Sequence, residues 1–177
     1  MALACSDPLP PPAARTELVL LPNSLVVEVG GSRVRAFDGE GSVRWELPLP
    51  DHDVAVTPLS AARNSTTYVR GVRAVYAITP TGGIAWSHSL DPSSFPADRA
   101  LIYAPVALAD SGVALVLGRK SIVSLDSKGQ PRWDGEVPSG DLVGVPRALG
   151  SGHLLVPTTT GLYAYTPTGS VEWRVAP

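Results

Sequence analysis

Short apolar runs separated by turn-forming residues recur four times along this 177-residue chain. The runs are rich in Val, Leu and Ile and too short for helices, which is typical of β-strands. The first run of each unit stands before a proline, at 18–21, 54–57, 101–104 and 142–145. The second runs are at 25–29, 66–70, 113–117 and 154–156. A glycine follows each second run closely, and there the chain can turn back.

A twelve-residue stretch carrying the third and fourth runs is copied in every unit. Each copy opens on an aliphatic residue, has a glycine four positions before its Trp, and ends on that Trp. The copies are 34–45, 75–86, 122–133 and 162–173. The Trp residues are spaced by 41, 47 and 40 positions. Four strands in a period near forty residues predict β-propeller blades. Solenoids of helix pairs share the period, but not this composition of Val, Gly and Pro.

The pattern predicts an all-β chain in which helix is nearly absent. Residues 1–16 hold four prolines and are expected to form a disordered tether. Residues 17–177 form the propeller domain, with blades at about 17–50, 51–91, 100–138 and 141–177. No strand is left over to complete a shared blade, so closure would depend on packing between the first and last blades. Three arrangements stay open: the four blades close as a tight ring, two chains pair to form an eight-bladed ring, or the edge strands stay exposed.

The copied stretch is a turn motif. Asp or Thr begins each turn, and a short polar side chain there can accept backbone amide hydrogen bonds. The glycine supplies the left-handed position. The turn residues are Asp38, Thr79, Asp126 and Thr166, and the glycines are Gly41, Gly82, Gly129 and Gly169. We expect Trp45, Trp86, Trp133 and Trp173 to fill the space that small residues, Ala36, Ala77, Ser124 and Ala164, leave on the adjacent blade.

The segments Ala36 to Trp45 and Ala77 to Trp86 resemble the repeat of quinoprotein-type propellers, known as PQQ-like repeats, with the pattern Ala-x-Asp-x-x-Thr-Gly-Lys-x-x-Trp. Every copy here is one residue shorter before its Trp, and two copies have Thr in place of Asp. The shortened form is familiar among PQQ-like proteins that bind no quinone. In that family the Trp motif is structural, so the resemblance implies a fold and no activity.

The charge balance argues against a nucleic-acid partner. Fourteen Lys and Arg face sixteen Asp and Glu, and no run of one sign is long enough to form a patch. No apolar run has the ~20 residues that a membrane helix needs. The segment from Met1 to Asp7 resembles the end of a bacterial lipoprotein signal. Cys5 is therefore either a lipidation site or an incidental thiol in the tether.

Residues for catalysis, cofactors or metals are missing from the sequence. We find no match to the catalytic Asp or calcium ligands of quinone-dependent dehydrogenases. His52, His88 and His153 lie in different units without further ligands at metal-binding spacing. The sequence predicts no cofactor and no metal site. The trio Asp51-His52-Asp53 is interpreted as a solvated loop between blades.

The connection at 89–99 is about six residues longer than its counterparts. It carries Phe95 and Arg99, an aromatic and an Arg of the kind that anchor protein interfaces. The loop is therefore a candidate partner-binding site, and the alternative is a tolerated insertion.

The functional prediction is a non-enzymatic, protein-binding or scaffolding module of the bacterial cell envelope, periplasmic or extracellular. The resemblance implies protein partners and is compatible with a homodimer and a lipid anchor. The alternative is part of a quinoprotein-like or carbohydrate-active propeller enzyme, whose site needs a second copy or a partner chain.

Overall fold

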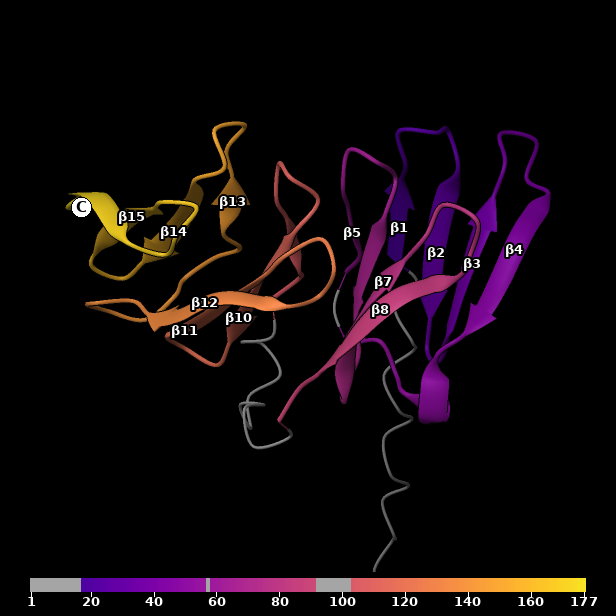
Figure 1. Cartoon of the computed structure of the whole chain (residues 1–177), viewed down its shortest axis with the longest axis horizontal. Helices are drawn as coiled ribbons and strands as arrows, with labels where there is room; N and C mark the ends of the chain where they lie inside the picture. The colour runs from indigo at the N-terminus through magenta and orange to yellow at the C-terminus, as the bar shows by residue number, and fades with distance from the viewer. Residues whose placement is uncertain (1–16, 57, 92–102) are drawn as a thin grey trace, which may run out of the picture.

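Four antiparallel four-stranded sheets form four blades, and their strand order within each sheet follows the chain. The structure is a computed structural model that describes residues 17–56, 58–91 and 103–177. Figure 1 shows the blades as an open arc, with blade 1 in indigo at one end and blade 4 in yellow at the other. The predicted all-β propeller architecture is confirmed.

Each blade has four strands. Blade 1 consists of β1 (Glu17–Leu20), β2 (Val26–Gly30), β3 (Arg33–Phe37) and β4 (Val43–Pro48). Blade 2 consists of β5 (Ser60–Ala61), β6 (Thr67–Arg70), β7 (Ala74–Ile78) and β8 (Ile84–Ser89). Blade 3 consists of β9 (Val106–Ala107), β10 (Val113–Leu117), β11 (Ser121–Leu125) and β12 (Pro131–Glu136). Blade 4 consists of β13 (Arg147–Ala148), β14 (Leu154–Thr158), β15 (Gly161–Tyr165) and β16 (Val171–Val175). Within the described residues, the only helical element is the 3-10 turn η1 (Pro50–His52).

The first strands of neighbouring blades lie side by side, since β1 contacts β5, β5 contacts β9, and β9 contacts β13. The turns between first and second strands, and between third and fourth strands, lie at one end of the blades, which we call the turn face (Figure 1). The second-to-third-strand turns and the connections between blades lie at the opposite end, because neighbouring strands are antiparallel.

The first strands differ from the prediction in blades 2 to 4. There they are only two residues long and follow the prolines Pro58, Pro105 and Pro146. The described parts of the runs before these prolines are not strands, although two residues form isolated bridges, Ala55 with Gly71 and Leu142 with Thr158. Proline has no N–H to donate to a sheet, so the paired segment begins after it. The other predicted runs match the strands to within a few residues.

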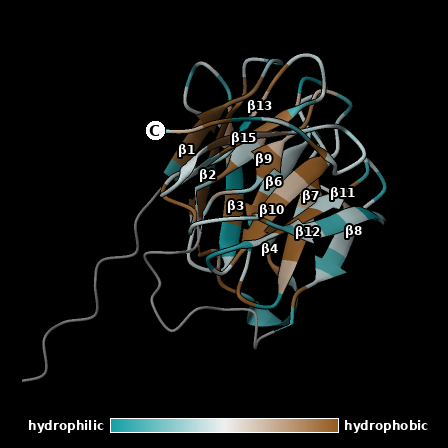
Figure 2. Cartoon of the chain, turned by 90° about the vertical axis from the view of Figure 1, so that its left-hand side faces the viewer, coloured by the Kyte–Doolittle hydropathy of each residue, from teal (hydrophilic) through white to brown (hydrophobic). Residues whose placement is uncertain are grey.

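Three hydrophobic clusters fill the spaces between consecutive blades. In the first, Val27 and Val34 of blade 1 pack with Val69 and Ile78 of blade 2, all fully buried. Figure 2 shows the consequence for the strands: β7 and β10, middle strands of their sheets, are mostly hydrophobic, whereas the outermost strand β8 is mostly hydrophilic. Most of the apolar surface that drives folding therefore lies between blades.

Candidate functional site

Three of the four motif Trp residues dock onto the next blade. Each indole donates its Nε1–H to a backbone carbonyl in the turn between the third and fourth strands of that blade. The bonds run from Trp45 to Pro80 at 2.9 Å, from Trp86 to Ser127 at 2.9 Å, and from Trp133 to Pro167 at 3.1 Å. The same turn's glycine lies against the indole ring. The motif therefore joins blade 1 to blade 2, blade 2 to blade 3, and blade 3 to blade 4.

The Asp or Thr that begins each turn holds it in shape. Asp38 Oδ1 accepts the backbone N–H groups of Glu40 and Ser42, at 3.0 and 2.9 Å. Thr79 Oγ1 accepts only the Gly83 N–H, at 3.0 Å, and it bonds the hydroxyl of Thr81. A threonine thus replaces one backbone hydrogen bond with a hydroxyl pair, so both Asp and Thr can hold the turn at this position.

The small residues of the motif have a different role from the one predicted. Ala36 lies directly opposite Trp45 of its own blade, and Ala77 opposite Trp86. Ala77 belongs to the core between blades 2 and 3, where Trp86 also packs. The small residue therefore makes room for the Trp of its own sheet, because side chains directly opposite on antiparallel strands share one face.

A matched pair of glycine substitutions measures the docking contact. Gly41 and Gly129 have similar φ angles, 83° and 79°. A Cβ on Gly129 would lie 2.6 Å from Trp86 Cδ2, whereas a Cβ on Gly41 meets nothing within 4 Å. We expect Gly41→Ala to cost about 1–2 kcal/mol of backbone strain. Gly129→Ala should cost a further ~1–3 kcal/mol through overpacking. Chemical denaturation of dilute protein checks this, and equal losses would contradict the docking contribution.

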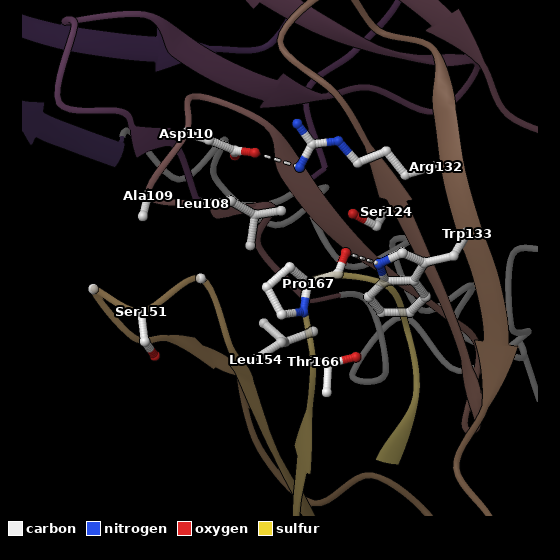
Figure 3. A pocket seen from close by; sticks show the side chains of 12 residues that line it. Leu108, Ala109, Asp110, Ser124, Arg132, Trp133, Ser151, Leu154, Thr166 and Pro167 are labelled. Atoms are coloured by element: carbon white, nitrogen blue, oxygen red, sulfur yellow. Dashed lines mark hydrogen bonds and ion pairs between the residues drawn. The ribbon is translucent and has the colours of Figure 1, made fainter. Parts of the chain in front are cut away.

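The turn face carries a groove between blades 3 and 4 (Figure 3). Its volume is about 300 Å³. The β9–β10 turn forms one wall, β12 contributes Arg132 and Trp133, and the turns of blade 4 form the other wall. A second depression of about 120 Å³ shares Leu108, Ala109 and Gly150 with it and extends to Arg63 of blade 2. Its lining includes Ala61, Ala62, Ala107, Ala109 and Ala148. Together they form one groove over the turns of blades 2 to 4, which we call the turn-face groove.

One ion pair stands in the wall of the turn-face groove. Asp110 Oδ2 lies 2.5 Å from Arg132 Nη1, and Asp110 Oδ1 accepts the Gly112 N–H at 3.0 Å. Burial alone would raise the pKa of the Asp110 carboxyl, but the Gly112 amide and the Arg132 guanidinium outweigh it and hold the pKa below its usual value. Asp110 is therefore ionised at neutral pH, and both of its oxygens already have a partner within the chain. These two properties make it a poor general acid or base.

Asp53 is a buried carboxylate that the sequence interpretation did not find. Asp51 and His52 are exposed, as expected for a solvated loop, but the same expectation is wrong for Asp53, which is 3% exposed. Its oxygens accept four backbone N–H groups and one hydroxyl. The donors are Val54, Val72, Arg73 and Ala74, at 2.8 to 3.3 Å, and the Tyr76 hydroxyl, at 2.9 Å.

These bonds tie the connection from blade 1 to the β6–β7 turn of blade 2. Gly71 is part of the arrangement, because a Cβ there would lie 2.1 Å from Asp53 Oδ2. Burial, followed by the bond to Asp53, raises the pKa of the Tyr76 hydroxyl, which stays protonated as a donor. In the sequence, only the presence of an Asp in the connection between blades could have indicated this site, and many loops contain such a residue.

Arg70 is a second buried polar residue without a sequence signal. It is fully buried in β6, and its Nη1 donates to the Val116 carbonyl of blade 3 at 2.6 Å. Burial lowers its pKa to about 10. Nearby in the same strand, the Tyr68 hydroxyl donates to the Ser111 carbonyl of blade 3. Polar side chains thus support the interface between blades 2 and 3.

The other residues that the sequence analysis singled out do not come together at one site in the described residues. Cys5, Phe95 and Arg99 fall outside the described residues, so they stay predictions. His153 bonds Ser151 Oγ at 2.8 Å and Glu172 at 3.0 Å, far along the chain from His52 and His88. Within 17–56, 58–91 and 103–177, no three His, Cys, Asp or Glu side chains gather as metal ligands. The same residues include no helix long and apolar enough to cross a bilayer.

Solved structures with the same fold are roughly twice as long as the part they share with this chain. The chain resembles BamB from Moraxella catarrhalis with a TM-score of 0.66 and 20% identity, covering 86% of this chain and 50% of that one. It resembles virginiamycin B lyase from Staphylococcus aureus with a TM-score of 0.68 and 15% identity, and the match covers 96% of this chain and 58% of that one. For the Pan2 WD40 domain of Neurospora crassa, the TM-score is 0.66 and the sequence identity is 14%, and the match covers 93% of this chain and 50% of that one. At these identities the likeness shows the fold alone.

Sequence comparison identifies the family. No sequence among the curated proteins matches the chain. A family profile described as "Outer membrane protein assembly factor BamB" matches residues 71–177, which is more than half of the chain. The matched region includes strands β7 and β8 of blade 2, the whole of blades 3 and 4, and the contacts of Trp86 and Trp133 with the next blade. The chain therefore belongs to this BamB-like family of PQQ-like repeat propellers.

Proposed function

We propose that the chain is a non-catalytic, protein-binding propeller module of the bacterial cell envelope, and that it contacts its partner through the turn-face groove. The observation that carries the proposal is the composition of the groove. Small apolar side chains form much of its lining, and the Asp110–Arg132 pair is satisfied within the chain. Such a surface suits an extended apolar segment of another protein more than a reaction that needs a free acid or base.

The family match supports the location and the class of function. The matched family is described as an outer membrane protein assembly factor, and this description supports both an envelope location and a role that involves other proteins. Lipidation at Cys5 would fit the same location. Mass spectrometry of protein made from its natural reading frame would test it, because an unmodified Cys5 would contradict lipidation.

A substitution at the rim of the turn-face groove tests the binding proposal. Leu149 lines the second depression and is 40% exposed, so Leu149→Glu should place a charge there without unfolding the chain. Val72 is 39% exposed and lies in the β6–β7 turn at the opposite end of the blades. We expect Leu149→Glu to reduce partner capture at least tenfold, the effect of about 1.4 kcal/mol, and Val72→Glu to leave it unchanged.

The measurement is site-specific photo-crosslinking in cells of the natural host, with a photoreactive residue at Ala109. A crosslinked protein that is lost in Leu149→Glu and kept in Val72→Glu supports the groove. Equal crosslinking in both variants would show that Leu149 takes no part in the binding, and no crosslink from Ala109 in the parent chain would place the partner elsewhere on the module.

One alternative function stays open, because an enzyme, virginiamycin B lyase, is among the proteins with a similar structure. In that alternative the chain is part of a propeller enzyme, and a second copy or a partner chain completes its site. Quinone or calcium retained by the purified protein would favour it, as measured by absorbance and metal analysis.

A further inference from the structure

The outermost strand of each blade is a sheet edge, and the edge of blade 2 differs from the other three. The position before the motif Trp and the position after it are exposed in every blade. In blades 1, 3 and 4 both positions carry a charge, and the residues are Arg44 and Glu46, Arg132 and Asp134, and Glu172 and Arg174. In blade 2 the same two positions hold Ala85 and Ser87. The edge of blade 2 therefore lacks the charges that the other edges carry at this place.

The backbone of β8 presents hydrogen-bonding groups to the outside of its sheet. The Leu90 N–H donates to the Arg73 carbonyl at 2.8 Å, so this pair is hydrogen-bonded. Bonded positions alternate along antiparallel strands, so His88 also bonds β7, whereas the N–H and C=O groups of Ser87 and Ser89 point away from it. Among the described residues, β7 is the only strand that pairs with β8 (Figure 1).

Charges and prolines are the usual protection of such an edge, because a bare edge can pair with a strand of another chain. A charge beside the edge opposes pairing, since the added strand would remove the charge from water. In blade 1, Pro48 also removes an edge donor at the position that Ser89 has in blade 2. Blade 2 has neither device at these positions. Of the four outermost strands, β8 is therefore the most receptive to an added strand.

The exposed serines of β8 lie on the side of the sheet that faces blade 1. Ser87 lies opposite Tyr76, and Ser89 lies opposite Ala74. Side chains directly opposite on antiparallel strands share one face. Tyr76 and Ala74 pack in the core between blades 1 and 2, and Leu47 of blade 1 packs at the margin of that core. A strand added to β8 would therefore place alternate side chains beside small serines and close to an apolar margin.

We propose that β8 accepts an extended segment of another protein as an additional strand of blade 2, and that this segment has uncharged, bulky apolar side chains at alternate positions. The occupant must be an extended chain, because a strand offers N–H and C=O groups at the spacing of Ser87 and Ser89. Its side chains beside the two serines have room to be large and an apolar margin to contact. The residues that line the turn-face groove include none from β8, so this inference does not depend on the proposed function.

The test uses the synthetic peptide Thr-Val-Thr-Val-Thr-Val, N-methylated at every threonine. The methyl groups block one edge of the peptide and prevent its growth into sheets, while the valines keep the other edge free. We expect saturable binding to the full chain, with slower hydrogen exchange at the Ser87 and Ser89 amides, measured by NMR. The same peptide N-methylated at every residue is the control, and it should not bind.

A matched pair of double variants tests the role of charge. Ala85→Arg with Ser87→Glu gives β8 the residues of blade 1, and it should weaken peptide binding by about tenfold or more. Ala85→Gln with Ser87→Gln adds side chains of similar length without charge, and it should bind as the parent does. Both positions are exposed, so both double variants should fold. Leu149→Glu, the variant of the turn-face groove, should also bind the peptide as the parent does.

Three results would overturn the inference. The first is a parent chain that does not bind the peptide, and the second is equal binding by the charged and the glutamine variants. The third is a parent chain whose mass in solution doubles with concentration while the charged variant stays monomeric. That result would mean that a second copy, and not a segment of another protein, pairs with β8.

Discussion

The Asp53→Ala variant should unfold with a free energy about 3–5 kcal/mol below that of the parent chain, the largest loss expected from a single substitution here. Removing the carboxylate leaves the Val54, Arg73 and Ala74 amides and the Tyr76 hydroxyl without this acceptor. Each buried donor left unsatisfied costs about 1–3 kcal/mol. Chemical denaturation, followed by circular dichroism, gives the value.

Two variants control for the loss at Asp53. Tyr76→Phe removes a single hydrogen bond and should cost about 1 kcal/mol. Asp51→Ala changes an exposed neighbour and should stay within about 0.5 kcal/mol of the parent. An Asp53→Ala chain as stable as Asp51→Ala would show that the carboxylate does not hold the blade 1 connection to blade 2.

Trp133→Ala should lower the free energy of unfolding by about 3 kcal/mol, whereas Trp173→Ala should lower it by less than about 1 kcal/mol in dilute monomer. Trp133 stacks on Tyr165 at a centroid distance of 5.9 Å, bonds Pro167, and packs over Gly169. Trp173 is 40% exposed, and among the described residues no glycine turn lies against it. The two side chains stand at the same motif position, so the difference measures docking onto the next blade.

Trp133→Phe refines this comparison. It keeps an aromatic ring over Gly169 but cannot donate to the Pro167 carbonyl, and we expect an intermediate loss of about 1–2 kcal/mol. Equal losses for Trp133→Ala and Trp173→Ala, measured where the chain is monomeric, would mean that the indole stabilises its own sheet and not the neighbouring blade.

Much of the fold was predictable because its determinants are local. The second, third and fourth strands follow from apolar runs with glycine or Asp and Thr at the turns, and these residues act within a few positions of themselves. The first strands were misplaced in blades 2 to 4, because an apolar run and a true inner strand both lie beside the proline. Only pairing with β6, β10 and β14 decides between them.

The candidate site was much less predictable. Nothing around Asp53 in the sequence separates it from an exposed loop residue, because its partners at 72–76 lie about twenty positions away. The turn-face groove likewise combines turns from three blades. Phe95 and Arg99, the predicted anchors, remain untested.

The sequence by itself determined that this protein is a four-unit β-propeller array of PQQ-like repeats, because strand period, turn chemistry and the copied Trp motif are read within each repeat. Only the tertiary structure decided which carbonyls Trp45, Trp86 and Trp133 reach, that Asp53 is buried, and that Trp173 is more exposed than the other three among the described residues. Those features depend on contacts between blades, and identical motifs acquire different environments according to whether another blade lies beside them.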